Sequence, residues 1–240
     1  MVDFSTYRAL SFDCYGTLID WESGIRAWVD GWIAKTGVET TADAFLRAFN
    51  RHESAVQAAE PSERYPLILA EVARRFARDA GLTVSDEDAE AFGASVGDWP
   101  AFEDSTSALR RLRERFELII LSNVDRLSFA RSNEQLGVTF NSVITAEDVG
   151  SYKPDPQNFD TLLATADAIG VPKHQLLHVG ESLFHDIQPA NRDGIDVVWI
   201  NRGGVRDTPR ASGGTDSAQL GKPVATFTSM SDFADAALAS

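Results

Sequence analysis

The sequence predicts an α/β fold, and three observations support this prediction. Short apolar runs that end in small or polar residues recur along the chain. Helical patterns separate most of these runs, which is typical of a parallel sheet with right-handed crossovers. Between residues 21 and 99, however, one helical pattern follows another with no strand. We therefore expect a Rossmann-like parallel sheet flanked by helices, with a helical cap inserted after the first strand.

The predicted strands are short apolar runs, and helices are predicted between the later ones. The strands are expected at Ala9 to Phe12, Leu118 to Leu121, Ser142 to Thr145, Leu176 to Val179 and Val197 to Ile200. The helices are expected at Ser105 to Arg115, Arg126 to Leu136 and Pro156 to Ile169. In the last helix, Asp155 is placed to cap and Pro156 takes the first helical position.

The predicted cap spans residues 21–99, and the predicted core comprises residues 1–20 and 100–240. Helical spacing within the cap appears in three sets of apolar residues: Ile25, Trp28, Val29, Trp32 and Ile33, ended by Gly37; Phe45 and Phe49; and Leu69, Val72, Ala73 and Phe76. An insert that follows a strand lies over the edge where open α/β sheets bind ligands. The cap is therefore expected to cover the functional site.

Composition excludes several classes of protein. The chain of 240 residues is large enough for a full core, and its single cysteine, Cys14, allows no internal disulfide. A formal net charge of −14 disfavours a nucleic-acid partner. The N-terminus lacks a secretory pattern and no apolar run is long enough for a membrane span, so we expect a cytoplasmic protein. Residues 202–222, rich in Gly, Thr, Ser and Pro, are expected to form a surface excursion.

Polar side chains follow four of the predicted strands, at the edge where parallel strands share one crevice. They are Asp13, then Ser122 and Asn123, then Lys153, and finally Glu181 with Asp186. A carboxylate at a buried strand end can attack carbon or phosphorus and form an ester or acyl phosphate that water hydrolyses. Asp13 is the expected nucleophile, and Lys153 is expected to keep it ionised by charge pairing.

Two neighbouring features are suited to binding the reacting group. Gly16 permits a sharp turn after Asp13, so that backbone N–H groups and the Thr17 hydroxyl face the site. Ser122 and Asn123 can donate hydrogen bonds to an anionic group of the substrate. His178 lies inside an apolar strand and is interpreted as a packing residue.

The motifs together resemble the haloacid dehalogenase superfamily. The segments that carry the resemblance, in order, are Asp13-Cys14-Tyr15-Gly16-Thr17-Leu18, Leu121-Ser122-Asn123, Tyr152-Lys153-Pro154, and Val179-Gly180-Glu181 with Asp186. The resemblance covers residues 8 to 200 and implies a cap in the first insertion position. Most members of the superfamily are phosphatases with a second acid two residues after the nucleophile. Here that position is Tyr15, and a phenol with a reference pKa of about 10 is a poor general acid at neutral pH.

The DxYGT form resembles the L-2-haloacid dehalogenase (type II) branch, whose departing halide needs no proton. The resemblance implies that Asp13 attacks C2 of a small (S)-2-haloacid with inversion and that water hydrolyses the ester to a 2-hydroxy acid. Thr17, Ser122, Asn123 and Lys153 fall on matching positions, and Arg47 matches the halide-side arginine. The branch also implies no cofactor, a small anionic carboxylate substrate and a homodimer.

The fourth motif departs from that branch. Leu183 occupies the position of an asparagine that holds the hydrolytic water, so Glu181, Asp186 or His185 is expected to position it. Glu181 and Asp186 also resemble magnesium-binding acids of the phosphatase branch. If magnesium binds, the expected ligands are Asp13, the Tyr15 backbone, Glu181 and Asp186.

Three alternatives to dehalogenation stay open from the sequence. The first is ring opening of L-azetidine-2-carboxylate, for which Tyr15, His185 or a bound water would deliver a proton to the ring nitrogen. Trp21 would supply an aromatic wall to either pocket. The second is a magnesium-dependent phosphatase with an altered first motif. The third is a catalytically silent binding module, which the presence of Asp13, Ser122 and Lys153 disfavours.

Overall fold

The sheet has the predicted parallel architecture. The computed structural model describes residues 2–202 and 221–239. In these residues the strands are β1 (Ala9–Phe12), β2 (Glu117–Ser122), β3 (Ser142–Thr145), β4 (Leu176–Gly180), β5 (Asp196–Ile200) and β6 (Ala225–Phe227). They form one six-stranded sheet in the order β3-β2-β1-β4-β5-β6 over the described ranges, and every neighbouring pair is parallel. The order reverses beside β1, which places the end of β1 at the switch point where such sheets bind ligands.

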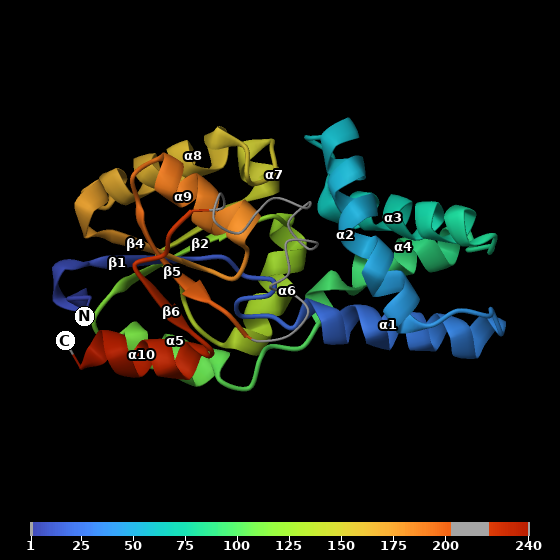
Figure 1. The fold of residues 1–240 in the computed structure, drawn as a ribbon, viewed down its shortest axis with the longest axis horizontal. Helices are drawn as coiled ribbons and strands as arrows, with labels where there is room; N and C mark the ends of the chain where they lie inside the picture. Colours follow the sequence, from blue (N-terminus) through green and yellow to red (C-terminus); the bar gives the residue numbers. More distant parts are fainter. Residues whose placement is uncertain (1, 203–220, 240) are drawn as a thin grey trace.

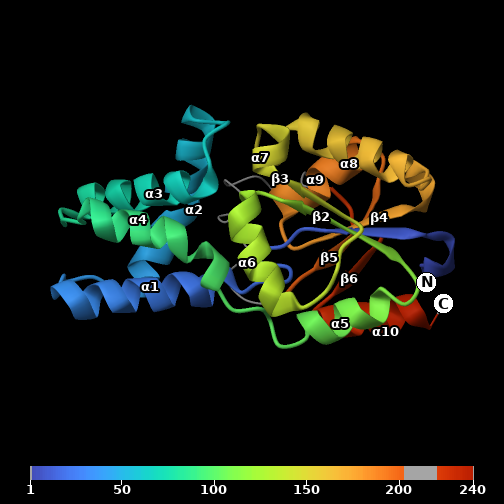
Figure 2. The same cartoon turned by 180° about the vertical axis from the view of Figure 1, so that it is seen from behind.

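Helices cover both faces of this sheet (Figure 1). The helical elements of the core are η1 (Phe4–Thr6), α5 (Ser105–Leu112), α6 (Arg126–Leu136), α7 (Ala146–Val149), α8 (Pro156–Ala168), η3 (Lys173–Gln175), η4 (Leu183–Ile187), α9 (Gln188–Arg192) and α10 (Met230–Leu238). Figures 1 and 2 show α8 and α9 over one face, and α5 and α10 over the other. The Rossmann-like prediction is thus confirmed.

Side-chain alternation along β1 decides what each face of the sheet contains. Leu10 and Phe12 pack in one cluster with residues of α5 and α10, whereas Ala9 packs in the other with Phe159 of α8. Because successive strand side chains point to opposite faces, Ser11 lies on the α8 side with Ala9. The polar residue of β1, Ser11, is thereby separated from the larger apolar cluster.

The cap is a layer of helices beside the carboxyl edge of the sheet (Figure 1). Its helical elements are α1 (Trp21–Thr36), α2 (Ala42–Ala59), α3 (Tyr65–Ala80), α4 (Asp86–Ala94) and η2 (Ser95–Asp98). Glycines in the left-handed conformation end α1 and α3, at Gly37 (φ +68°) and Gly81 (φ +68°). These elements fall between residues 21 and 99, and the division of the chain at those positions stays our prediction.

Aromatic rings fill the interior of the cap. Phe92 is fully buried, and its ring centroid lies 4.5 Å from that of Trp28 and 5.3 Å from that of Phe45. Phe49 and Trp99 each lie 6.4 Å from it. These tilted and edge-to-face contacts join α1, α2 and α4 into one packed unit.

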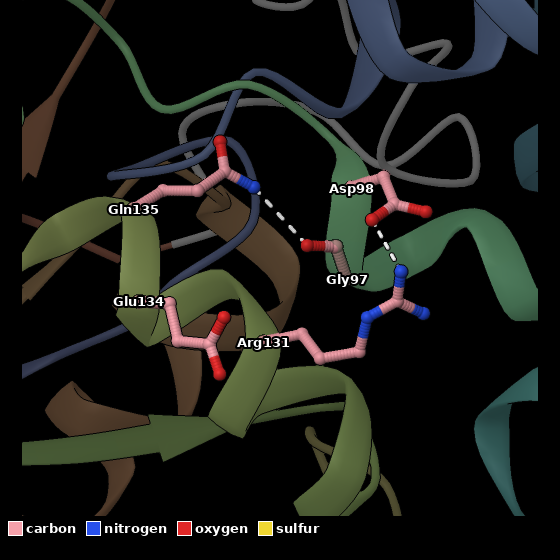
Figure 3. Close-up of a pocket in the computed structure, with 5 residues that line it drawn as sticks. All are labelled: Gly97, Asp98, Arg131, Glu134 and Gln135. Atoms are coloured by element: carbon pink, nitrogen blue, oxygen red, sulfur yellow. Dashed lines mark hydrogen bonds and ion pairs between the residues drawn. The ribbon is translucent and has the colours of Figure 1, made fainter.

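The cap is attached to the core through α6. Gln135 Nε2 donates to the backbone oxygens of Gly97 (3.1 Å) and Trp99 (3.0 Å). Arg131 forms an ion pair with Asp98 beside these bonds (Figure 3). Glu134 completes the lining of a cavity of about 460 Å³ at this junction. None of these residues belongs to the predicted site, so the cavity marks the joint between cap and core.

The predicted strands are all present, and the structure differs from the prediction in a few helices and in the last strand. Helix α5 ends at Leu112 rather than Arg115, because the next N–H groups bond three residues back instead of four: Glu114 N donates to Arg111 O (3.2 Å) and Arg115 N to Leu112 O (3.1 Å). We did not predict α4, which has Phe92 as its one large apolar residue, or β6 and α10, which follow residues 203–220. The expected excursion over 202–222 lies largely outside the described residues. At its start Arg202 is not a surface residue, since its side chain is 9 % exposed. In the described part of the chain, no helix combines the length and hydrophobicity that a membrane crossing requires.

Phe92→Ala should strongly destabilise the protein. Removing a buried ring that contacts other aromatic rings leaves a cavity, and the expected loss in the free energy of unfolding is about 3–5 kcal/mol. Urea unfolding followed by circular dichroism measures this loss. Leu67→Ala is the matched control, because Leu67 lies on α3 with 44 % of its surface exposed. Equal losses for the two variants would contradict the packing described above.

Candidate active site

The centre of the candidate site is the ammonium group of Lys153, which is 1 % exposed. Its Nζ donates to Asp13 Oδ1 (2.9 Å), Asp186 Oδ1 (2.7 Å) and the backbone oxygen of Leu121 (3.0 Å). These bonds use the N–H groups of an ammonium completely. The structure thus brings together the predicted nucleophile, the predicted lysine and the last predicted acid, from three segments of the chain.

Burial and charge pairing oppose each other in this cluster. Burial disfavours the charged form of Lys153, but Asp13 and Asp186 outweigh it and raise the lysine pKa. Burial likewise disfavours the charge of Asp186, but Lys153 and His178 hold its pKa well below the usual range. Burial raises the pKa of Asp13, and the charge of Lys153 and the hydrogen bond from Thr17 limit that rise. Asp186 is therefore the permanent counter-charge of the lysine.

Exposure separates the roles of the two acids. Asp186 is completely buried, whereas Asp13 is 8 % exposed. Asp186 Oδ1 also lies 3.3 Å from His178 Nε2, and Asp186 Oδ2 accepts a hydrogen bond from Ser182 N at 3.1 Å. Of these two carboxylates, Asp13 is the one that a substrate can reach.

Gly180 allows Asp186 to approach the end of β4. A Cβ atom added at Gly180 would lie 2.6 Å from three atoms of the Asp186 side chain. Asp186 itself lies on η4, a π-helical turn that Ser182 caps by accepting from His185 N with its hydroxyl oxygen. The small residue in the fourth motif thus has a steric function.

The turn after β1 holds the second oxygen of Asp13. Thr17 Oγ1 donates to Asp13 Oδ2 at 2.7 Å and accepts from Glu181 N at 2.9 Å. Gly16 has φ +102°, a conformation that favours glycine. The guanidinium of Arg202 donates to the Thr17 backbone oxygen at 2.7 and 3.0 Å. Thr17 is therefore fixed from both sides while it orients Asp13.

Ser122 and Asn123 differ in their hydrogen bonding. Asn123 Nδ2 donates to Lys153 O (3.1 Å), and its Oδ1 accepts from Lys153 N (2.7 Å). This amide braces the backbone of Lys153, which the sequence did not predict. Ser122 Oγ is buried and has no hydrogen-bond partner among the described residues. Its role as a donor to substrate stays a prediction.

Two aromatic residues line the start of the cap connection. The Tyr15 hydroxyl lies 2.8 Å from Ser132 Oγ on α6, and burial raises the pKa of Tyr15 well above its usual value. Trp21 begins α1 and stacks on Phe49 at 5.4 Å between ring centroids. Tyr15 is thus engaged with the core, whereas Trp21 joins the nucleophile turn to α2.

The candidate water-positioning residues lie on the segment after β4. A Cβ added at Gly16 would lie 3.0 Å from Glu181 Oε2, so Glu181 packs against the turn that follows Asp13. His185 Nδ1 lies 3.3 Å from Ser182 Oγ. Burial lowers the pKa of His185 to about 4, which makes its imidazole neutral at pH 7. The contacts with the turn that follows Asp13 thus come from Glu181, through its carboxylate and its backbone N–H group.

Arg47 is not brought to this cluster by any described contact. It is exposed on α2, whereas Phe45 and Phe49 on either side of it are buried. A residue two positions from each of them points away from their face of the helix. The halide-side role of Arg47 stays a prediction without support from this arrangement.

The predicted magnesium ligands do not fit a metal ion as they are arranged. The carboxylates of Asp13 and Asp186 bind Lys153, and their remaining oxygens accept from Thr17 and Ser182. Over residues 2–202 and 221–239, no three His, Cys, Asp or Glu side chains are grouped to hold a metal. We therefore derive no step through a metal ion.

Sequence reasoning missed the residues behind the cluster. His178, interpreted as a packing residue, connects Asp186 Oδ1 (3.3 Å) to Ser11 Oγ (2.8 Å from Nδ1). All three side chains are fully buried. A serine and a histidine at paired positions of two buried strands, Ser11 and His178, were the signal that would have revealed this network.

The fold and this charged cluster at the strand ends are those of an α/β enzyme. The sequence profile of haloacid dehalogenase-like hydrolases matches residues 7–192. The chain belongs to that family and is a hydrolase. Its similarity to an (S)-2-haloacid dehalogenase of Pseudomonas putida is 27 % identity over 206 residues, covering 81 % of this chain and 85 % of the relative.

Two further proteins show the breadth of the relationship. A phosphoserine phosphatase of Thermus thermophilus is 30 % identical over 127 residues, 52 % of this chain and 50 % of the relative. The structure of L-2-haloacid dehalogenase from Xanthobacter autotrophicus superposes with a TM-score of 0.78 at 16 % identity, covering 95 % of this chain and 97 % of that one. The structural similarity to the Xanthobacter protein shows that the two chains share a fold.

Asp186→Asn should remove a pH-dependent part of the stability. The pKa of Asp186 is lowered by folding, so its contribution is complete above its unfolded pKa of about 3.9 and is lost as pH falls toward its folded value. The free energy of unfolding of the variant should be about 3–5 kcal/mol lower than that of the wild type at pH 7, because a buried partner of Lys153 is removed. Its stability should also fall less steeply than that of the wild type between pH 5 and pH 3.

Urea unfolding at several pH values measures both effects. Asp160→Asn serves as the control, since Asp160 is exposed on α8. A variant that keeps the wild-type pH slope would show that Asp186 is not the counter-charge of Lys153.

Proposed function

We propose that this protein is an (S)-2-haloacid dehalogenase with Asp13 as its nucleophile. An Asp13 oxygen attacks C2 of the substrate and the carbon–halogen bond breaks, so halide leaves with its electron pair and an ester forms. Water then hydrolyses the ester, giving a 2-hydroxy acid, a proton and free Asp13. The proposal rests on the reachable Asp13 carboxylate beside the buried Lys153 ammonium.

The observation that carries the choice of leaving group is the position of Tyr15. Phosphatases of the superfamily use an acid at this position to protonate a leaving alcohol. Here the Tyr15 hydroxyl forms a hydrogen bond with Ser132 Oγ, and burial raises the pKa of Tyr15 well above its usual value. It is unsuited to proton transfer at neutral pH. Halide departs without a proton, so dehalogenation makes no demand on Tyr15.

The proposed base for the second half-reaction is Glu181. It packs against Gly16, and its N–H group donates to Thr17 Oγ1, which itself orients Asp13. The Asp186 oxygens already accept from Lys153 and Ser182, which leaves that acid a structural counter-charge. A water held by Glu181 would be placed beside the ester carbonyl.

A second candidate is ring opening of L-azetidine-2-carboxylate, which uses the same attack at C2. It is favoured by the acidic character of the cluster, where Asp13, Asp186 and Glu181 accompany Lys153. Carboxylates stabilise a substrate that carries a cationic nitrogen. The magnesium-dependent phosphatase and the silent binding module stay as outcomes of the test, and the homodimer stays a prediction.

The wild-type protein should release chloride from (S)-2-chloropropionate and not from the (R) enantiomer. Asp13→Asn should abolish release, because the amide is not a nucleophile. Chloride, ring-opened azetidine product and phosphate from a general phosphate ester are measured in parallel, with magnesium and with chelator. Magnesium-dependent phosphate release alone would overturn the proposal, and no turnover of any compound would favour the binding module.

Glu181→Gln should slow ester hydrolysis more than ester formation. A variant that lacks the base is expected to accumulate the Asp13 ester, because base catalysis contributes about 10²- to 10⁴-fold to such steps. Mass spectrometry of the quenched protein detects the added carboxyalkyl mass on the peptide that contains Asp13. Steady turnover at the wild-type rate, without the adduct, would exclude Glu181 as the base.

A further inference from the structure

One face of α2 carries a row of buried and partly buried side chains. Phe49, Glu53 and Gln57 follow one another at spacings of four residues, so their side chains share a face of the helix. Phe49 and Gln57 are buried, and Glu53 is partly buried between them. An acid in a buried stripe is unusual, since carboxylates are costly to remove from water.

Two residues of this face have contacts that lead toward the core. Phe49 stacks on Trp21, and Trp21 Nε1 lies 3.3 Å from the position of a Cβ on Gly16. One turn further along the helix, Glu53 Oε1 accepts from the Tyr65 hydroxyl at 2.6 Å.

Tyr65 connects Glu53 to the lysine loop of the core. Its ring centroid lies 6.4 Å from that of Tyr152, the residue before Lys153. The Tyr152 hydroxyl donates to Glu63 O, in the connection between α2 and α3. Glu53 therefore lies on a part of the cap that contacts both the turn after Asp13 and the loop that carries Lys153.

The Glu53 carboxyl has hydrogen-bond donors but no cationic partner. Tyr65 and Gln57 Nε2 (3.4 Å) both donate to Oε1. The ion pairs formed by the described residues do not include Glu53, and burial raises its pKa to about 7. A carboxyl in this state would gain free energy from a cation that enters the site.

Charge in the catalytic cluster points the same way. Lys153 is committed to Asp13 and Asp186, so its charge is already neutralised before a substrate enters. Glu181 adds a further acid beside Gly16. A substrate with a positive group would meet a more favourable field here than a simple anion.

We infer that Glu53 binds a cationic nitrogen of the substrate, so that the natural substrate is a 2-substituted carboxylic acid that also carries an amine or ring nitrogen. This inference rests on the proposed attack of Asp13 at C2 and narrows its substrate class. In that reaction the Asp13 oxygen–C2 bond forms and the bond from C2 to the leaving group breaks. Glu53 takes no part in bond making; it binds the nitrogen and sets specificity.

Two substrates of equal size test the inference. (S)-2-Chloro-4-aminobutyrate and (S)-2-chloropentanoate have the same number of heavy atoms and the same reacting centre. The first ends in an ammonium group where the second ends in a methyl group. The wild type should favour the amino compound about 10- to 100-fold in kcat/KM, the range expected for a charged hydrogen bond. Chloride release measures both rates.

The variants separate charge from structure. Glu53→Gln should abolish the preference while changing turnover of the chloropentanoate less than about threefold, and Glu53→Asp should retain part of the preference. Glu90→Gln, at an exposed acid of α4, is the matched control and should keep the wild-type preference. Melting temperatures show whether each variant is folded.

The outcomes distinguish this inference from the proposed function. No preference in the wild type, or an equal loss of both substrates in Glu53→Gln, would overturn the role of Glu53. If neither compound releases chloride, the proposed function fails. Calorimetry then still tests Glu53, by measuring how tightly the Asp13→Asn variant binds each compound. The inference is supported if the amino compound binds more tightly and if adding Glu53→Gln removes this difference. Equal affinities refute it.

Discussion

The buried ammonium of Lys153 is the constraint around which this enzyme is organised. Its bonds to Asp13, Asp186 and the Leu121 carbonyl bring the ends of β1 and β2 and the turn after β4 to one point. A single one of these charges would be unstable in the interior, because the free energy needed to remove it from water exceeds the stabilisation from one weak contact. Gly180, Asn123, His178 and Thr17 can all be understood as supports of this cluster.

The supports act on different partners. Asn123 fixes the backbone of Lys153, and His178 with Ser182 fixes the carboxylate of Asp186. Thr17 fixes Asp13 and is itself bound by Arg202. The result is an Asp13 carboxylate with little freedom to rotate, which in the proposed reaction reduces the reorganisation needed during attack.

The cap adds a second set of contacts over this rigid base. Its aromatic core makes α1, α2 and α4 one unit, and α6 binds that unit through Gln135 and Arg131. The face of α2 with Phe49 and Glu53 is therefore held in place relative to the strand ends. In the proposed function the core supplies the attacking carboxylate of Asp13, and in our inference the cap supplies Glu53, which selects the substrate.

The order of motifs in the sequence was sufficient for the fold, the family and the residues that meet at Lys153. These features are readable because apolar runs, turn residues and short motifs are local properties of the chain. The partners of those residues were not readable. The role of Asn123, which could face substrate or hold Lys153, depends on a segment thirty residues further along the chain. The role of His178, which could pack or form a hydrogen bond with Asp186, depends on a π-helical turn.

The cap shows the same limit more strongly. The sequence predicted helices between residues 21 and 99 from their apolar spacing, and it offered Arg47 as a contact to the site. Tertiary structure instead leaves Arg47 exposed and joins Glu53 to Tyr65 above the lysine loop. Periodicity shows which residues of a helix share a face, but the packing of one helix on another decides what that face meets. Sequence thus determined the catalytic core, and only the tertiary structure decided which part of the cap lies over it.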